Sequence, residues 1–140
     1  MKLQEVLGVA LFVSGLLTGA LGSQILFAQN NPGLASKMLF RGDLQNLPGQ
    51  EALVFTSDWN AGFRLPLHKH PNGHEWTFVV EGEQTFYIEG VGDKLVKAGE
   101  VIYTAPNTAH FGRNATEKLS KTVVFRVKDK DQPIMVEVKP

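Results

Sequence analysis

Short apolar runs separated by turn residues form most of the chain beyond residue 29. Each run is three to six residues long, and Gly, Pro, Asn and Asp gather in the breaks between runs. This spacing is typical of the short strands of a β-sandwich or β-barrel, and no stretch shows the period of an amphipathic helix. We therefore predict an all-β, antiparallel domain. The runs that predict its strands are 52–56, 63–67, 76–80, 84–89, 94–96, 101–104, 122–127 and 134–138.

The N-terminal part of the chain has a different pattern. No charged residue lies between Glu5 and Lys37, and the stretch 6–22 is almost wholly apolar. A lysine at position 2 and small residues such as Ala28 on the far side of the apolar stretch are typical of a secretory signal peptide. We expect a hydrophobic helix here that directs export to the periplasm or the extracellular space.

Two alternatives stay open for this segment. Residues 6–28 are long enough to span a bilayer if they remain uncut, which would anchor the protein in a membrane. A buried helix of the domain is the other alternative. The predicted organisation is a signal peptide or membrane anchor over 1–28, a linker over 29–43 and the β-domain over 44–140.

Composition and charge narrow the classes of function. The 140 residues suit one domain, and 14 Lys and Arg balance 14 Asp and Glu. With no excess of positive charge, nucleic acid is excluded as the expected partner. The chain has no cysteine, which excludes disulfides, thiolate zinc sites, iron–sulfur clusters and a cysteine nucleophile. Any metal must be bound by nitrogen and oxygen.

Candidate chemistry lies in the histidines, all four of which fall between His68 and His110. His68 and His70 share a face only if they lie on a strand, since residues two apart on a helix point away from each other. Pro66 and Pro71 bracket the pair and argue against a helix. The two imidazoles are therefore predicted to form a chelating pair on a strand.

A carboxylate is predicted to join this pair. Glu75 is five residues beyond His70, an odd step that would place it on the opposite face of an uninterrupted strand. The dipeptide Asn72-Gly73 is a strong hairpin signal, so the chain is expected to reverse and return Glu75 beside the histidines. His74 then points elsewhere and is interpreted as a surface or supporting residue. His110 cannot be placed by local geometry.

At this point the residues resemble a known family. The pattern Gly62-x5-His68-x-His70-x4-Glu75-x6-Gly82 resembles the first motif of the cupin superfamily, and Gly99-x5-Ala105-x-Asn107-x2-His110-x3-Asn114 is similar to the second. The usual proline and glycine of the second motif are replaced by Ala105 and Asn107, and asparagine tolerates the left-handed backbone that such a glycine supplies. The resemblance implies an antiparallel double-stranded β-helix, or jelly-roll barrel, that holds a metal. The implied metal ligands are His68, His70, Glu75 and His110.

This set of donors also limits the metal and its ligand. Three neutral imidazoles and one carboxylate suit a divalent ion such as Fe, Mn, Ni, Co or Zn, and six-coordination would leave two positions for water or substrate. A divalent ion and the Glu75 carboxylate would leave a charge of about +1, so the expected small-molecule ligand is anionic or a chelating oxygen compound.

Strand alternation predicts what surrounds the site. If Glu75 points inward, Thr77 and Val79 point inward too, whereas Trp76 and Phe78 point outward. Such an apolar outer stripe needs a cover, so we expect a homodimer or a second sheet over it. A set of charged residues near the C-terminus is expected to form a solvated edge: Lys118, Lys121, Lys128, Asp129, Lys130 and Asp131. The residues predicted to line the ligand pocket are Gln84, Phe86, Ile88 and Tyr103.

Two functions from different classes are compatible with this site. The first is an exported metal-dependent enzyme, either a dioxygenase acting on an enediol, catechol or flavonol-like substrate or an isomerase. The second is a non-catalytic periplasmic module that binds or senses a metal or a small ligand. No general base is evident in the sequence, which keeps the second function open.

Overall fold

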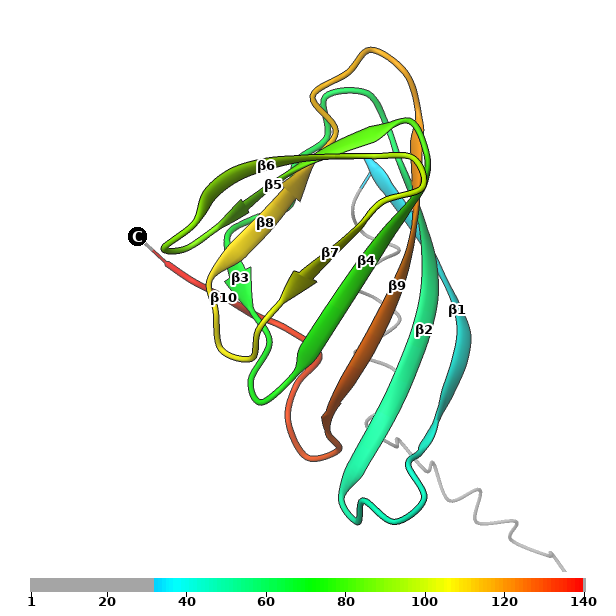
Figure 1. The fold of residues 1–140 in the computed structure, drawn as a ribbon, viewed down its shortest axis with the longest axis vertical. Coiled ribbons are helices and arrows are strands. Elements are labelled where there is room, and N and C mark those ends of the chain that lie inside the picture. The colour runs from blue at the N-terminus through cyan, green and yellow to red at the C-terminus, as the bar shows by residue number, and fades with distance from the viewer. Residues whose placement is uncertain (1–31, 140) are drawn as a thin grey trace, which may run out of the picture.

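The computed structural model describes residues 32–139, which form two facing five-stranded sheets. One sheet has the strand order β1-β2-β9-β4-β7 and the other the order β10-β3-β8-β5-β6 (Figure 1). The strands are β1 (Leu34–Asp43), β2 (Gln50–Trp59), β3 (His68–Lys69), β4 (His74–Glu81), β5 (Glu83–Ile88), β6 (Gly92–Lys97), β7 (Val101–Thr104), β8 (His110–Arg113), β9 (Ser120–Asp129) and β10 (Val136–Glu137).

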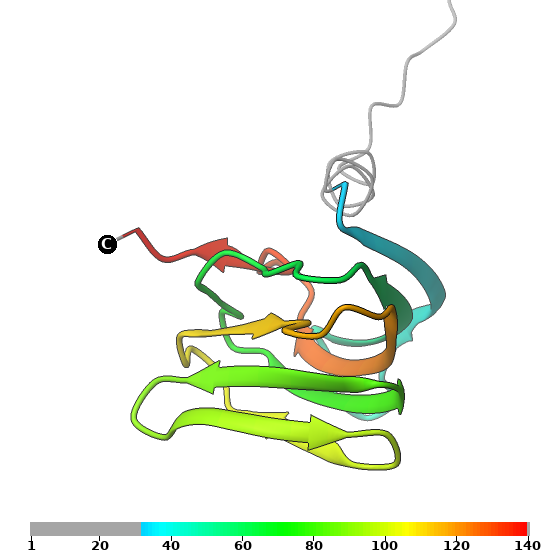
Figure 2. The same cartoon turned by 90° about the horizontal axis from the view of Figure 1, so that it is seen from above.

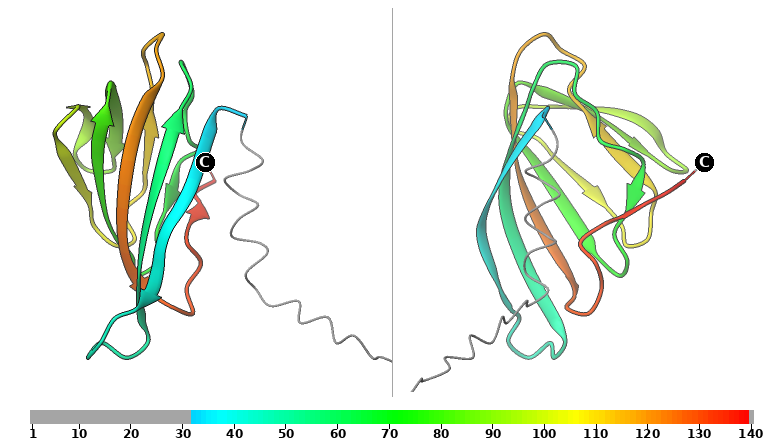
Figure 3. Two further views of the ribbon diagram at one scale, coloured as in Figure 1. Left: turned by 90° about the vertical axis from the view of Figure 1, so that its right-hand side faces the viewer. Right: turned by 180° about the vertical axis from the view of Figure 1, so that it is seen from behind.

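All strand pairs are antiparallel, and consecutive strands often lie in different sheets. Seen from above, the two sheets wrap around a common interior (Figure 2). The side view shows the long strands β9 and β2 running the length of one wall (Figure 3). The prediction of an all-β, antiparallel jelly roll is therefore confirmed for the described residues.

Alternation along each strand sets which side chains face this interior. On β4, Glu75, Thr77 and Val79 are buried, whereas Trp76 and Phe78 between them are exposed. The predicted inward and outward faces of β4 are thus confirmed. On β5 the even-numbered positions are buried, as the sequence predicts for Gln84, Phe86 and Ile88.

The apolar core lies between the sheets. Val79, Phe86 and Val96 pack together, and the half-buried Ile102 packs against them. Asn114 is also fully buried, and its side-chain amide donates to the carbonyls of Trp59, Asn60 and Lys118. These bonds anchor the turn between β8 and β9, because a buried amide without partners would be costly.

Two asparagines adopt the left-handed backbone conformation and shape the loops at the histidine end of the barrel. Asn107 has φ 62°, so it supplies the conformation expected of the missing motif glycine. Asn72 has φ 49°, and its backbone N–H donates to Asn107 Oδ1 at 3.3 Å. The Asn107 N–H in turn donates to the His70 carbonyl at 3.0 Å. The loop after His70 and the loop before His110 are thereby tied together.

The structure differs from the sequence prediction in three segments. The expected linker over 29–43 contains strand β1, which pairs with β2 from Leu34 opposite Trp59 to Asp43 opposite Glu51. β1 is an edge strand with most side chains exposed, so burial leaves no alternating pattern in its sequence. The predicted strand 63–67 makes only an isolated bridge at Arg64, because Pro66 cannot donate to a ladder. Strand β8 was not expected from its composition.

The predicted N-terminal helix over residues 1–28 lies outside the described residues. Within 32–139, no helix is long and apolar enough to cross a membrane. The charged edge expected between Lys118 and Asp131 is correct in part: Lys118 and Lys121 are exposed or half-buried, but Lys128 is only 1% exposed. Lys128 points into the barrel because it shares the inner face of β9 with Val124 and Arg126.

Candidate metal centre

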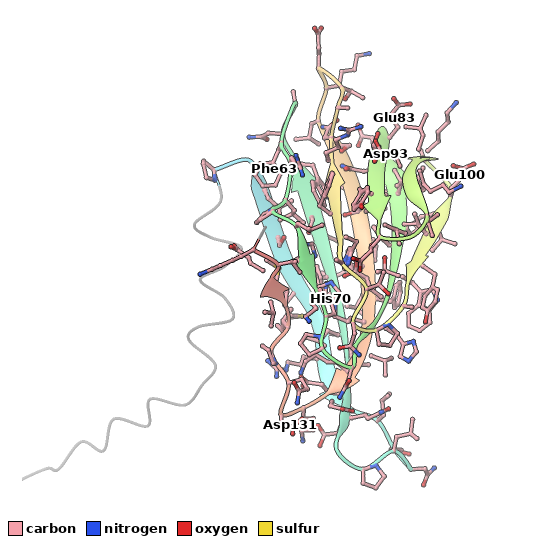
Figure 4. All side chains as sticks on the ribbon, turned by 90° about the vertical axis from the view of Figure 1, so that its left-hand side faces the viewer. Phe63, His70, Glu83, Asp93, Glu100 and Asp131 are labelled. Atoms are coloured by element: carbon pink, nitrogen blue, oxygen red, sulfur yellow. The ribbon has the colours of Figure 1, made fainter. Side chains whose placement is uncertain are left out.

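Three histidines from neighbouring segments converge inside the barrel. His68 begins β3, His70 follows it directly, and His110 begins β8, which pairs with β3 so that His68 lies opposite His110. Their ring centroids are 5.0 Å (His68 and His70), 4.3 Å (His68 and His110) and 4.9 Å (His70 and His110) apart. One nitrogen from each ring lies within 4.8 Å of the others. Figure 4 shows His70 in the middle of the molecule, whereas Glu83, Asp93 and Glu100 lie near one end.

Backbone carbonyls fix the orientation of all three rings. The Nδ1 atoms lie 2.8 Å from the Pro66 oxygen for His68, 2.6 Å from the Ile134 oxygen for His70 and 2.9 Å from the Thr108 oxygen for His110. A carbonyl only accepts, so each Nδ1 must carry the proton. The lone pair of each imidazole is then on Nε2, which is the arrangement that orients histidines for metal binding.

Glu75, the second residue of β4, reaches the same point from the other sheet. Its Oε2 lies 3.1 Å from His70 Nε2, and its Oε1 lies 3.6 Å from His110 Nε2. The Nε2 atoms of His70 and His110 are buried and have no hydrogen-bond partner in the described part of the chain. Electron-rich atoms that face one another without a proton between them repel, and a cation at their centre would relieve this repulsion.

Burial and charge hold His68, His70 and Glu75 in the protonation states that a metal needs. Burial, helped by His110 and His70, lowers the pKa of His68 to about 3. Burial also lowers the pKa of His70, against the opposing effect of Glu75. For Glu75, burial acts to raise the pKa, but Arg126 and the histidines outweigh it and hold the pKa well below its ordinary value. Neutral imidazoles and an ionised carboxylate are the metal-binding forms.

The donor set therefore fits a divalent metal ion. His68, His70 and His110 would hold the ion, with Glu75 as the fourth donor, and all four side chains are at least nine-tenths buried. Nitrogen and oxygen donors of this kind suit Fe, Mn, Ni, Co or Zn. The structure thus brings together all four residues that the sequence predicts as ligands.

His74 does not take part in this cluster. It is exposed on the outer face of β4, its Nδ1 lies 2.8 Å from the Tyr103 hydroxyl, and its ring stacks on Trp76. The interpretation of His74 as a surface residue is confirmed.

The four predicted pocket residues lie in different parts of the barrel, three inside it and one on its surface. Ile88 lies opposite His110 in the pairing of β5 with β8 and is the one nearest the histidines by register. Phe86 belongs to the apolar core, and Gln84, further along β5, donates to Ser120 Oγ. Tyr103 was wrongly predicted: it is 45% exposed, because β7 pairs with β4 so that Tyr103 lies beside the outward-facing Trp76.

Sequence reasoning missed Arg126, which contacts the site directly. Arg126 lies on β9 opposite Glu75 on β4, and its Nη2 donates to Glu75 Oε2. Its Nη1 donates to the Ile134 carbonyl at 3.1 Å, the same oxygen that accepts from His70. An arginine at an inward position within the apolar run 122–127 was the signal available in the sequence.

The comparisons with known proteins agree with this geometry. A family model described as "Cupin domain" matches residues 56–125, half of the chain. The chain belongs to the cupin family. No curated protein matches the sequence.

Solved structures of other cupin-like proteins share the fold at low sequence identity. KdgF from Halomonas sp. is 18% identical, with a TM-score of 0.61 over 73% of this chain and 84% of that one. An uncharacterised double-stranded β-helix protein from Klebsiella pneumoniae is 16% identical, with a TM-score of 0.63 over 79% and 88%. The DMSP lyase DddQ from Ruegeria pomeroyi is 18% identical, with a TM-score of 0.63 over 81% of this chain and 59% of that one.

Proposed function

We propose that this cupin binds one divalent metal ion and uses it to bind a small oxygen-rich ligand. The observation that carries the proposal is the convergence of two buried imidazole nitrogens on the Glu75 carboxylate, with the His68 ring packed beside them; neither nitrogen has a hydrogen-bond partner among residues 32–139. A bound ion would supply Lewis-acid or redox chemistry to a coordinated oxygen.

The chain's own residues would prepare this site in three ways. The carbonyls of Pro66, Ile134 and Thr108 hold the protons on Nδ1 and so keep each Nε2 available. Thr77 donates to Glu75 Oε1 at 3.3 Å and orients the carboxylate. Burial of the donor set excludes bulk water, which strengthens any electrostatic interaction made there.

As an enzyme, the protein would be a metal-dependent dioxygenase or isomerase. Four donors leave two positions on a six-coordinate ion, which suits a chelating enediol, catechol or flavonol-like ligand. One of the proteins that share this fold, DddQ from Ruegeria pomeroyi, is named as a DMSP lyase.

One observation favours the alternative of a non-catalytic binding or sensing module. Glu75 is the carboxylate at the centre of the site, and its ion pair with Arg126 keeps its pKa well below the ordinary value. Burial opposes this lowering without reversing it. A carboxylate in that state is a weak proton acceptor, so it is poorly suited to act as a general base.

Metal analysis of the protein purified from its own compartment tests the proposal. We expect close to one equivalent of a first-row divalent metal per chain. The metal-loaded protein is then given a panel of enediols, catechols and flavonols in an oxygen electrode. Oxygen consumption supports the dioxygenase, product formation without oxygen uptake supports the isomerase, and stoichiometric metal without turnover supports the binding module. Protein that takes up no divalent metal overturns all three.

We further propose that the protein is exported, with residues 1–28 as a cleaved signal peptide or residues 6–28 as an uncleaved anchor. The apolar sequence of that segment supports this proposal. The intact mass of the protein recovered from periplasmic or extracellular fractions tests it. A mass lower by the first 22 or 28 residues indicates cleavage, and a full-length chain in the membrane fraction indicates an anchor. Full-length protein in the cytoplasm contradicts export.

A further inference from the structure

A buried guanidinium lies against the candidate metal centre. Arg126 is 6% exposed, and its Nη2 donates to the same Glu75 oxygen that lies 3.1 Å from His70 Nε2. Its Nη1 donates to the Ile134 carbonyl, but its Nε is buried without a partner among residues 32–139. The guanidinium therefore has an unused N–H donor while one of its nitrogens contacts a metal-site carboxylate.

This guanidinium changes the charge of the site. Three neutral imidazoles contribute nothing, Glu75 contributes −1 and Arg126 contributes +1, so a divalent ion would leave +2 in a buried place rather than +1. Lys128 and Arg41 both pair with Glu51, with Lys128 Nζ at 3.0 Å from Glu51 Oε1, so this group brings no excess negative charge to the site. None of these neighbours offers a spare negative charge. Uncompensated charge in a protein interior is strongly unfavourable, so the loaded site needs an anion.

The geometry also indicates which anion. The Glu75 carboxylate contacts both the His70 Nε2 atom and the Arg126 guanidinium. A carboxylate at this place can therefore interact with an imidazole nitrogen and the guanidinium together. A guanidinium N–H forms a strong, charge-assisted hydrogen bond with a carboxylate, and a carboxylate oxygen is a good ligand for a first-row divalent metal. A small carboxylate is thus suited to both cations at once.

We propose that Arg126 is the specificity-determining residue of this site and that its positive charge selects small carboxylate anions as ligands. The inference rests on the proposed function, since it requires a divalent ion at the three histidines. It adds a substrate class to that function and assigns a role to a residue outside the cupin motifs.

The test measures ligand affinity on the Co(II)-loaded whole chain by visible absorption. Acetate is the anionic probe and imidazole is the neutral one. In Arg126→Gln the site loses one positive charge, so acetate should bind about 10- to 100-fold more weakly, whereas imidazole affinity should change by less than about threefold. Arg126→Lys keeps the charge and should keep the preference for acetate over imidazole.

A matched control and a double variant separate the charge of Arg126 from its contribution to folding. Arg113→Gln removes an arginine that is 39% exposed and paired with Asp93, and it should leave both affinities unchanged. Glu75→Gln combined with Arg126→Gln restores the site charge to +2 and avoids an unpaired buried carboxylate, so it remains informative if Arg126→Gln does not fold. This double variant should bind acetate more tightly than Arg126→Gln does.

Failure of the inference differs from failure of the proposed function. If the wild-type protein binds one Co(II) but Arg126→Gln keeps the wild-type preference for acetate over imidazole, Arg126 does not select the ligand. If only the double variant folds, its site charge of +2 should keep the preference for acetate, and a selective loss of acetate affinity there would show that the charge of the site does not select the ligand. If the wild-type protein shows no Co(II) absorption band at all, the metal site itself is wrong.

Discussion

His68 lies directly opposite His110 in the antiparallel pair of β3 and β8, and their ring centroids are 4.3 Å apart. The two residues are 42 positions apart in the chain, so only the sheet brings them together. Because cross-strand neighbours in an antiparallel pair point to the same face, both imidazoles face the interior and the histidine at position 70 joins them two residues later. One short strand pair therefore carries most of the candidate metal centre.

Removal of a ligand histidine should abolish stoichiometric metal binding. His70→Ala or His110→Ala takes away one of the converging imidazoles, and we expect metal content to fall from about one equivalent to well below half. His74→Ala is the matched control, since His74 is exposed and contacts Tyr103. Elemental analysis after dialysis checks this. Equal loss in all three variants would overturn the ligand assignment.

The C-terminal segment should influence metal affinity although it supplies no metal ligand. The Ile134 carbonyl accepts hydrogen bonds from both His70 Nδ1 and Arg126 Nη1. A chain that stops after Gln132 loses this carbonyl, so the His70 ring loses its orientation and the metal affinity should fall about 10- to 100-fold.

The control for this truncation is a chain that stops after Val138, which keeps β10 and the bond from Val138 N–H to the Leu67 carbonyl. Its affinity, measured by competition with a chromophoric chelator, should equal that of the full chain. If the chain ending at Gln132 also binds with full affinity while its urea midpoint is unchanged, the Ile134 carbonyl does not orient His70.

The sequence predicts the centre of this fold better than its edges, and the reason is physical. Strands such as β4 and β5 alternate between buried and more exposed positions, so one inward residue, such as Glu75 on β4, fixes the others of its strand by parity. β1 is an edge strand exposed on most positions, and β3 and β10 have two residues each, so they leave no such pattern. Their positions depend on pairing with distant strands.

The candidate site shows the same division. His68, His70 and Glu75 could be predicted because their spacing relates them to the turn at Asn72-Gly73, whereas His110 was assigned through the resemblance to the second cupin motif. Arg126 could not be placed beside Glu75 without the pairing of β9 with β4, which joins residues 51 positions apart. Tyr103 was wrongly placed for a related reason, since the face of β7 is set by its partner β4.

Acid should destabilise the metal-free protein from about pH 6.5 downwards. The pKa of His68 is lowered by burial to about 3 from an ordinary 6.5, and burial lowers the pKa of His70 as well. A histidine with a lower pKa in the folded state binds its proton more readily in the unfolded state. Its contribution to the free energy of unfolding is therefore complete above pH 6.5 and is lost as the pH falls. The free energy of unfolding should decrease by about 1.4 kcal/mol per pH unit for each such histidine.

Urea unfolding at pH 7.5, 6.5, 5.5 and 5.0 measures this slope. The range stays above the ordinary pKa of a glutamate, where the lowered pKa of Glu75 has little effect on stability. His68→Asn should reduce the slope of the free energy of unfolding against pH by about the contribution of one histidine. His74 is exposed, so His74→Asn should leave this slope unchanged. A flat profile in the wild-type protein would mean that the imidazoles are solvated in the folded state.

The outer face of the β1-β2-β9-β4-β7 sheet carries an apolar patch that we propose is covered by a second copy of this chain. The patch is made of exposed side chains that are neighbours by strand register, and it consists of Trp76, Phe78, Val101, Tyr103 and Phe125. Trp76 lies between Tyr103 on β7 and Phe125 on β9, so the five side chains form one surface. None of the five carries a charge that would select a charged partner. A twofold axis through such a surface pairs it with itself, as closed dimers require.

A lysine within this patch should break the dimer. Phe78 is 38% exposed, and Phe78→Lys would bury an unpaired charge in the interface, so we expect the dimer dissociation constant to rise at least about tenfold. Leu95→Lys on β6 is the matched control, because Leu95 is 54% exposed on the other sheet. Sedimentation velocity over a concentration series compares the three proteins. A wild-type chain that stays monomeric throughout would show that Trp76 and Phe78 face water in solution, and the second copy would then be the wrong cover for this sheet.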